Sequence, residues 1–176
     1  QPLQQVFGQQ KKLRFEENAA KAVGLARDTQ RKLLVWAGKE TPEHCAPDVE
    51  LLRVEDGFLR SRGLGAQLIA PLSLVSDDLG IYYDPTRKSR LEQLIAAASD
   101  LPPARLHRVE RLVTRLTRAG LSKYNLSQPD LPELPSGRRI LVPGQVEDDA
   151  SIRLGCTEVR TNRALLEAAR TAHPEA

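Results

Sequence analysis

Two loops of the sequence combine carboxylates with other polar residues directly after short apolar runs. The first follows the apolar run 51–54 and carries Glu55, Asp56, Arg60, Ser61 and Gly63. Carboxylates can accept and return protons, and an arginine can hold a carboxylate or a phosphate through two parallel hydrogen bonds. These residue types fit acid–base chemistry on an anionic substrate. From spacing alone, a polar turn with a surface ion pair is the alternative.

The second loop follows the predicted strand 138–143, whose residues from 140 on are apolar, and contains three consecutive acids. Its candidate residues are Gln145, Glu147, Asp148, Asp149 and Ser151. Carboxylate oxygens are the ligands that Mg²⁺ prefers, and a carboxylate can also act as a nucleophile. The residues alone leave three interpretations open: a magnesium site, a nucleophilic carboxylate, or an exposed acidic turn.

A third polar segment, 77–84, ends in a tyrosine pair, Tyr82 and Tyr83. The pair could pack on a sugar, but a place in the core is the favoured interpretation. The three histidines, His44, His107 and His173, share no metal-ligand spacing. No hydrolase, P-loop or zinc-protease motif occurs in the sequence.

The composition excludes several classes of protein. The chain has 176 residues, 40% hydrophobic and 28% charged, which is ordinary for a globular domain. No apolar run approaches the roughly 20 residues of a membrane span. A net charge of +3 and 4% aromatic residues give little reason to expect nucleic-acid binding. Cys45 and Cys156 belong to no metal or disulfide pattern, so reduced thiols are expected. Because the sequence contains no methionine, even at position 1, we expect a piece of a longer protein.

Periodicity predicts the elements that position these loops. We expect a helix over 19–31, buried strands over 32–38 and 51–54, and a third extended segment within 73–83 with a turn at 76–80. Helices are predicted over 89–99, where Ser89 and Glu92 form a capping box, and over 103–119, which ends at Gly120. Apolar residues of the second helix recur at three- and four-residue steps, which predicts a buried face.

The composition changes at 127–137, where prolines and small polar residues are typical of a linker. A strand over 138–143 and a helix over 162–172 are predicted beyond it. The alternation of helices and strands favours an α/β fold with a mostly parallel, Rossmann-like sheet. We therefore expect a domain at 1–126, a linker at 127–137, and the beginning of a second domain at 138–176.

A succession of strings resembles the capsule polysaccharide biosynthesis/export family, the retaining β-Kdo transferases of Gram-negative capsule assembly. The resemblance covers about residues 33–170 and is closest to the carboxy-terminal transferase module of two-module capsule proteins. The strings are 54–61 (VEDGFLRS), 63–65 (GLG), 71–73 (PLS), 78–84 (DLGIYYD), 89–92 (SRLE), 120–125 (GLSKYN), 142–152 (VPGQVEDDASI), and Asn162 with Leu165 and Leu166.

The resemblance implies a GT-B glycosyltransferase with two Rossmann-like halves. Its donor is CMP-Kdo and its acceptor a lipid-linked Kdo chain, with no cofactor and no metal. The implied location is the cytoplasm, with peripheral contact to the inner-membrane capsule-assembly machinery and no nucleic-acid partner. Residues 1–126 correspond to the acceptor-side half and 138–176 to the opening of the donor-side half. We therefore expect this chain alone to bind CMP poorly and to be inactive.

The resemblance also implies roles for the loop residues. Asp149 matches the position of the nucleophile, with Asp148 and Glu147 as the fallback, and Glu55 or Asp56 matches the acid/base. Arg60 is expected to pair with the Kdo carboxylate or a phosphate. The expected substrate-binding residues are Arg60, Ser61, Gly63, Gln145, Asp148 and Ser151. Within the family, the acidic triplet is better explained by this chemistry than by magnesium.

Two other functions compete with this one. A non-catalytic capsule export or scaffold protein could keep the fold and bind glycolipid or partner proteins. An unrelated nucleotide-binding α/β domain is the third interpretation.

Overall fold

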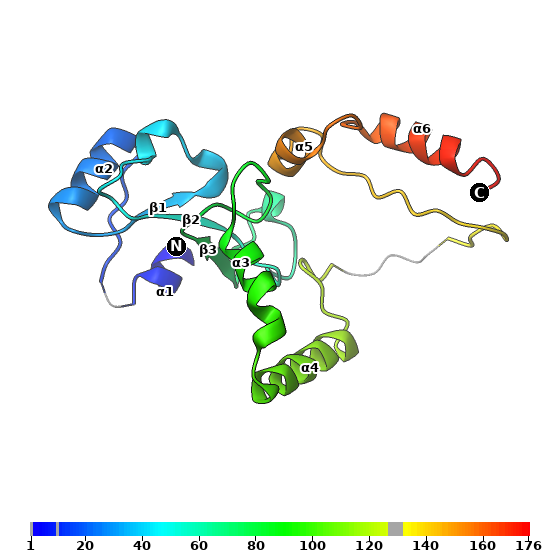
Figure 1. Ribbon diagram of the computed structural model, residues 1–176, viewed down its shortest axis with the longest axis horizontal. Helices are drawn as coiled ribbons and strands as arrows, with labels where there is room; N and C mark the ends of the chain where they lie inside the picture. The colour runs from blue at the N-terminus through cyan, green and yellow to red at the C-terminus, as the bar shows by residue number, and fades with distance from the viewer. Residues whose placement is uncertain (1, 10, 127–131) are drawn as a thin grey trace. The chain divides into compact units, whose positions relative to one another are not determined.

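A computed structural model describes residues 2–9, 11–126 and 132–176 of the chain (Figure 1). The chain forms two compact units. The first comprises 1–81 and 88–127, and the second comprises 82–87 and 128–176. Short helices precede and connect the main elements of the first unit: α1 (Pro2–Phe7), η1 (Ala37–Lys39), η2 (Pro42–His44), η3 (Gly65–Gln67) and η4 (Ala97–Asp100).

The first unit contains a three-stranded sheet in the order β1 (Leu33–Trp36), β2 (Leu51–Asp56), β3 (Leu74–Asp77). β1 and β2 are parallel, as predicted, with Leu33 opposite Leu51. The expectation of a mostly parallel sheet is wrong, because β3 runs antiparallel to β2, with Arg53 opposite Asp77. The physical reason is that the chain folds back on itself after β2. The N–H of Gly57 donates to the oxygen of Ser73 at 2.9 Å and the N–H of Leu72 donates to the oxygen of Arg60 at 2.7 Å, so the two ends of the connection lie side by side and β3 returns in the opposite direction.

Helix α2 (Ala19–Asp28) covers the start of the sheet and forms the core of the first unit. Val23 and Ala26 pack with Val49, and all three are buried. The Asn18 side chain caps the helix by accepting a hydrogen bond from the N–H of Lys21 at 3.0 Å. The helix predicted over 19–31 is confirmed and begins where expected, but it is shorter than predicted and ends at Asp28.

The capping box predicted for α3 (Arg90–Ala96) is confirmed. The Ser89 hydroxyl accepts from the N–H of Glu92 at 3.2 Å, and the Glu92 carboxylate accepts from the N–H of Ser89 at 2.6 Å. This backbone hydrogen bond, together with the Ser89 hydroxyl, lowers the pKa of Glu92. The buried Asp77 also stabilises the start of α3, because its Oδ2 accepts a hydrogen bond from the N–H of Arg90 at 2.7 Å. The start of α3 is thus joined to the end of β3.

Helix α4 (Pro103–Arg118) is followed by the C-cap Ala119 and then by Gly120, the predicted capping glycine. Gly120 has φ +60°, and the N–H of Leu121 donates to the oxygen of Leu116, which is the Schellman arrangement. The expectation that α4 buries its apolar face is wrong, because the helix has no buried residue. Helix α3 has none either. The apolar spacing of α4 is real, but within the described chain no element covers it.

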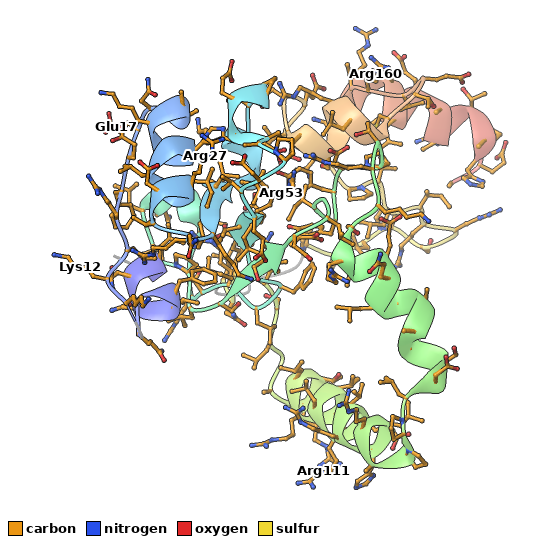
Figure 2. The ribbon with its side chains drawn as sticks, turned by 60° about the vertical axis from the view of Figure 1, so that its left-hand side comes forward. Lys12, Glu17, Arg27, Arg53, Arg111 and Arg160 are labelled. Atoms are coloured by element: carbon orange, nitrogen blue, oxygen red, sulfur yellow. The ribbon has the colours of Figure 1, made fainter. Side chains whose placement is uncertain are left out.

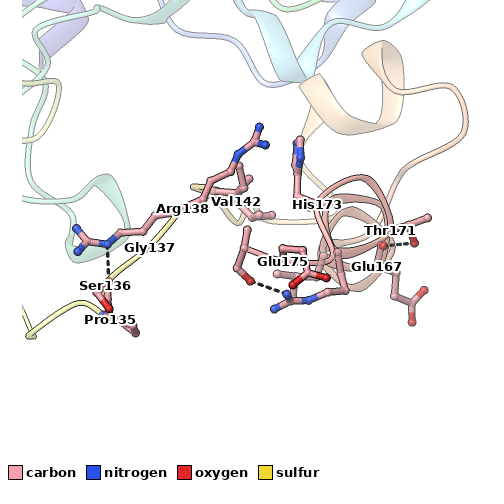
Figure 3. A pocket seen from close by; sticks show the side chains of 15 residues that line it. Pro135, Ser136, Gly137, Arg138, Val142, Glu167, Thr171, His173 and Glu175 are labelled. Atoms are coloured by element: carbon pink, nitrogen blue, oxygen red, sulfur yellow. Dashed lines mark hydrogen bonds between the residues drawn. The ribbon is translucent and has the colours of Figure 1, made fainter.

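The second unit contains α5 (Ala150–Gly155) and α6 (Asn162–Ala172), and α6 confirms the predicted helix. The predicted strand over 138–143 is wrong: these residues have no strand partner in the part of the chain that is described, and Leu141 is 89% exposed. Apolar residues favour an extended conformation, but a strand needs a hydrogen-bonded neighbour. A cavity of about 830 Å³ lies between residues 135–142 and the end of α6 (Figure 3).

The predicted linker falls partly outside the described residues, at 127–131. Residues 132–137 are exposed, as expected. Among the described residues, none of the helices combines the length and hydropathy that crossing a bilayer requires.

Candidate active-site loops

The first loop is held by main-chain hydrogen bonds to a segment far away in the sequence. The N–H groups of Arg60 and Ser61 donate to the oxygen of Lys123 at 2.8 and 3.2 Å. The N–H of Gly63 donates to the oxygen of Tyr124 at 2.7 Å. Sequence reasoning assigned no role to 122–125, although the string 120–125 was part of the resemblance. These contacts give the segment a role as the anchor of the loop.

Asn125 completes this anchor. Its side-chain nitrogen donates to the oxygen of Ser61 at 2.9 Å, and its side-chain oxygen accepts from the N–H of Ser122 at 2.9 Å. Asn125 has φ +49°, in the left-handed region that asparagine tolerates better than most residues. An asparagine at this position is therefore explained both by the left-handed backbone conformation and by the two side-chain hydrogen bonds.

Arg60 lies inside the loop, and its guanidinium is bound on several sides. Its Nε donates to Asp56 Oδ2 at 2.5 Å, and its Nη1 donates to the Ser61 hydroxyl at 2.9 Å and to the oxygen of Ile69 at 2.8 Å. Arg60 is only 6% exposed. A Cβ on Gly65 would lie 3.0 Å from Nη2, so glycine allows the chain to close over the guanidinium. Arg60 therefore crosslinks the loop.

The two predicted acids of the first loop differ in their surroundings. Asp56 forms the ion pair with Arg60, and its other oxygen, Oδ1, is buried without a hydrogen-bond partner among the described residues. Glu55 Oε1 accepts from the N–H of Asp56 at 2.9 Å, and the residue is half-buried. The charge of Asp56 is thus neutralised within the loop.

The second loop is tied to the beginning of α6 by Asn162. The side-chain oxygen of Asn162 accepts from the N–H of Gln145, and its side-chain nitrogen donates to the oxygen of Gln145, both at 2.9 Å. The N–H of Asn162 donates to Glu147 Oε1 at 2.7 Å. Gln145 is therefore held through its backbone, and the Glu147 carboxylate accepts a hydrogen bond from the first residue of α6.

Asp149 is the N-cap of α5. Its Oδ1 accepts from the N–H of Ser151 at 2.8 Å and from the Ser151 hydroxyl at 2.6 Å. Asp149 and its neighbour Asp148 are exposed. The structure thus brings the predicted residues of the second loop together at the start of one short helix.

The third predicted segment has a mixed environment. Tyr82 and Tyr83 contact each other edge to face, with ring centroids 5.4 Å apart, and both are half-buried. Asp84 Oδ1 accepts from the N–H and hydroxyl of Thr86 at 3.0 and 2.6 Å. These contacts describe a closed polar turn.

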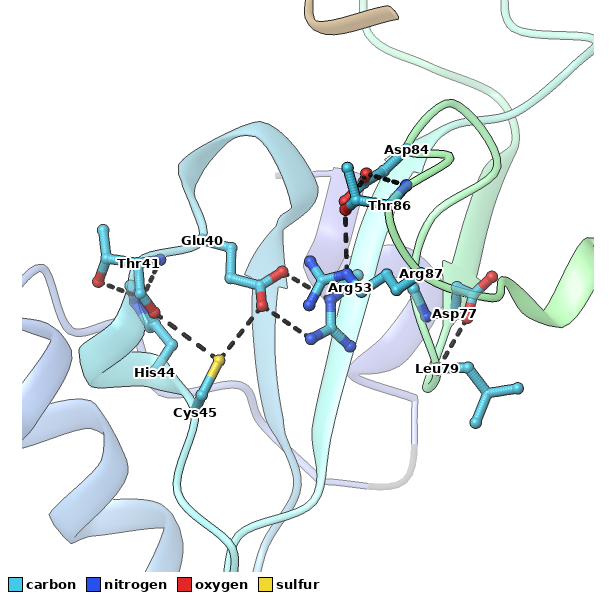
Figure 4. A network of polar contacts seen from close by, with 11 residues as sticks. Glu40, Thr41, His44, Cys45, Arg53, Asp77, Leu79, Asp84, Thr86 and Arg87 are labelled. Atoms are coloured by element: carbon cyan, nitrogen blue, oxygen red, sulfur yellow. Dashed lines mark hydrogen bonds and ion pairs between the residues drawn. The ribbon is translucent and has the colours of Figure 1, made fainter. Parts of the chain in front are cut away.

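Sequence reasoning missed a buried ion pair beside the first loop. Arg53, in the middle of β2, donates to both oxygens of Glu40 at 2.6 and 2.7 Å, and the Cys45 thiol contacts the same carboxylate at 3.3 Å (Figure 4). A lone arginine within an apolar strand was the available signal, because such a charge must find a partner. Within the described ranges, no group of three His, Cys, Asp or Glu side chains could hold a metal ion.

The profile of the family described as "Capsule polysaccharide biosynthesis protein" matches residues 37–129. The chain belongs to this family. The matched range contains β2, the first loop and the anchoring segment 122–125. The capsule-family resemblance seen in the sequence is therefore confirmed.

Two curated relatives are similar over most of the chain. "Lipopolysaccharide-processing protein LpsZ" of Rhizobium meliloti is 50% identical over 133 residues, which cover 73% of this chain and 30% of that protein. "Capsule polysaccharide modification protein LipA" of Neisseria meningitidis serogroup A is 38% identical over 169 residues, covering 94% and 24%. The chain thus spans less than a third of either relative.

Two solved structures from Thermosulfurimonas dismutans share the fold. "KpsC, beta Kdo 2,7 transferase" has a TM-score of 0.71 and 33% identity, covering 99% of this chain and 54% of that one. "KpsC, beta Kdo 2,4 transferase" has a TM-score of 0.65 and 30% identity, covering 92% and 57%. Both matches cover little more than half of the solved chain.

Two glycines of this capsule-family chain should respond oppositely to alanine. At Gly57, just after β2, a Cβ would lie 2.1 Å from the Ser73 hydroxyl and 2.8 Å from the Ser73 carbonyl carbon, so Gly57→Ala should destabilise the chain by about 1–3 kcal/mol. At Gly24, within α2, a Cβ meets nothing within 4 Å, so Gly24→Ala should stabilise it by about 1 kcal/mol. Urea unfolding of both variants measures the difference. Equal effects would contradict the close approach at Gly57.

Proposed function

We propose that this chain is part of a retaining β-Kdo transferase of capsule assembly, which moves Kdo from CMP-Kdo to a lipid-linked Kdo acceptor. The observation that carries the proposal is the similarity in fold and sequence to the two Kdo transferases of T. dismutans, at 33% and 30% identity. The family membership over residues 37–129 supports the capsule context. The acceptor-side role belongs to the first unit in this proposal, and the donor-side role to the second.

In the proposed reaction, Asp149 is the nucleophile. A carboxylate oxygen of Asp149 attacks the anomeric carbon of Kdo, and the bond from that carbon to the phosphate oxygen of CMP breaks, which releases CMP. An acceptor hydroxyl then attacks the same carbon and releases Asp149. Two inversions give net retention. The exposure of Asp149 supports the proposal, and its two hydrogen bonds from Ser151 support a role of Ser151 in orienting the carboxylate.

Glu55 is the better candidate for the acid/base that removes the acceptor proton. A base needs a carboxylate that can change its protonation state during the reaction. The Asp56 carboxylate is taken up by its ion pair with the buried Arg60 guanidinium inside the loop, so it is the poorer candidate. We therefore assign the proton transfer to Glu55 and a positioning role to Asp56 and Arg60. Ser61, Gly63, Gln145 and Asp148 remain the expected substrate contacts.

The experiment is a transfer assay on the longer protein, with CMP-Kdo as donor and a synthetic Kdo-terminated lipid as acceptor. We expect CMP release that depends on the acceptor and a product longer by one Kdo. A protein that binds the acceptor but releases no CMP would overturn the proposal and favour the scaffold function. Calorimetric titration of the present chain with CMP is the companion measurement, and we expect weak or no binding.

A further inference from the structure

Helix α4 carries a strong positive charge that the described chain does not neutralise. Its sequence contains five arginines and one glutamate, which gives a net charge of +4 with His107 neutral. Among the described residues, none of the five arginines forms an ion pair, and the Glu110 carboxylate pairs only with His107, at 3.7 Å. The Arg111 side chain extends away from the helix in Figure 2. The arginines are Arg105, Arg108, Arg111, Arg115 and Arg118.

The same helix exposes a continuous apolar face. Four of its large apolar side chains are between 44% and 55% exposed: Leu106, Val109, Leu112 and Val113. With Leu116 they fall in a sector of about 120° at 100° per residue, which is wider than the seam of a coiled coil. Apart from Arg105, the arginines project outside this sector. A face of this width suits a flat apolar boundary better than a second single helix.

The charge decides between possible partners. A second copy of α4 would bring two helices of charge +4 together, which like-charge repulsion opposes. A neutral apolar groove would cover the leucines and valines but leave the arginines without counter-charges. An anionic lipid surface satisfies both features, because it offers acyl chains to the apolar side chains and phosphates to the guanidinium groups.

We propose that α4 binds the surface of an anionic phospholipid bilayer and lies along it. The apolar face enters the boundary between headgroups and acyl chains, and the long arginine side chains reach the phosphates beside the helix. Surface binding requires no membrane-spanning helix. The proposal is independent of the transferase reaction, because lipid binding involves no turnover.

The test is flotation of the 176-residue chain with two sets of vesicles, one of phosphatidylcholine with phosphatidylglycerol and one of phosphatidylcholine alone. We expect binding to the first set that weakens with added salt, and little binding to the second. Replacing Arg111, Arg115 and Arg118 by glutamine should lower the affinity by at least about tenfold, since each cation near the surface contributes about 1 kcal/mol. Val109→Glu with Leu112→Glu should also remove binding, because it places charges in the apolar face.

The matched control loses the same charge elsewhere. Arg14, Arg138 and Arg153 are exposed arginines outside α4, and replacing all three by glutamine should leave vesicle binding at least several-fold stronger than in the α4 triple variant. Circular dichroism verifies that each variant folds, which is expected because no substituted side chain is buried. Equal losses in the two triple variants would overturn the proposal, as would an unbound wild-type chain. A wild-type dimer that the Val109→Glu/Leu112→Glu variant dissociates would instead assign α4 to a protein interface.

Discussion

Replacing Asp149 by asparagine should abolish Kdo transfer by the longer protein while leaving its fold intact. Asparagine caps a helix about as well as aspartate, and its side-chain oxygen can accept the same two hydrogen bonds from Ser151. The amide cannot attack the anomeric carbon, so kcat should fall by at least about 10³-fold, the order of loss on removing one member of a catalytic group. The rate of CMP release measures this loss.

The N-cap position of Asp149 supplies the control variants. Asp149→Ser keeps a capping hydroxyl without a nucleophile, and Asp149→Ala removes both. Capping alone contributes about 1 kcal/mol, so only the alanine variant should unfold at a lower denaturant concentration, whereas all three should be inactive. If the asparagine and serine variants retain transfer and the alanine variant loses it, Asp149 acts only as a cap.

A trapped intermediate would locate the covalent step directly. Glu55→Gln should slow removal of the acceptor proton, so that Kdo attached to Asp149 accumulates and appears as an added mass on the intact protein. Asp56→Asn should instead lower stability, because it weakens the ion pair with Arg60. An adduct in Asp149→Asn would identify Asp148 or Glu147 as the nucleophile.

Features decided by neighbouring residues were predictable from the sequence. The capping box of Ser89 and Glu92 depends on residues three apart, and the turn at Gly120 depends on one residue that tolerates positive φ. The parallel pairing of β1 and β2 is also confirmed, although it was predicted from the alternation of helices and strands along the chain and not from neighbouring residues. For the capping box and the turn at Gly120, the local sequence pattern is enough to determine the local backbone structure.

Features that depend on distant contacts were not predictable. The periodicity of α4 correctly indicated an apolar face, but periodicity does not show whether another element covers that face. Residues 138–143 have the composition of a strand, whereas strand formation depends on a hydrogen-bonded neighbour. The first loop was found from its residue types, yet the inward position of Arg60 depends on the oxygen of Ile69 and on the space left by Gly65.

The ion pair of Asp56 and Arg60 should be the largest single contribution to the stability of the first loop. Arg60→Met keeps much of the side-chain volume but removes the charge, which leaves the Asp56 carboxylate largely buried without a partner. Its side chain is 20% exposed, so the free energy of unfolding should fall by about 2–4 kcal/mol, somewhat below the 3–5 kcal/mol typical of a fully buried pair. Urea unfolding, followed by circular dichroism, measures this change.

Two further variants separate this structural role from substrate binding. Arg62 neighbours the pair but is exposed, so Arg62→Met should change stability by less than about 0.5 kcal/mol. Arg60→Met combined with Asp56→Leu should recover much of the lost stability, because replacing both charges by apolar groups removes the unpaired carboxylate. An Arg60→Met protein that is as stable as wild type but no longer binds the acceptor would show instead that the guanidinium serves the substrate. Stability lost in Arg60→Met and restored in the double variant is the result that the largely buried ion pair of Arg60 with Asp56 leads us to expect.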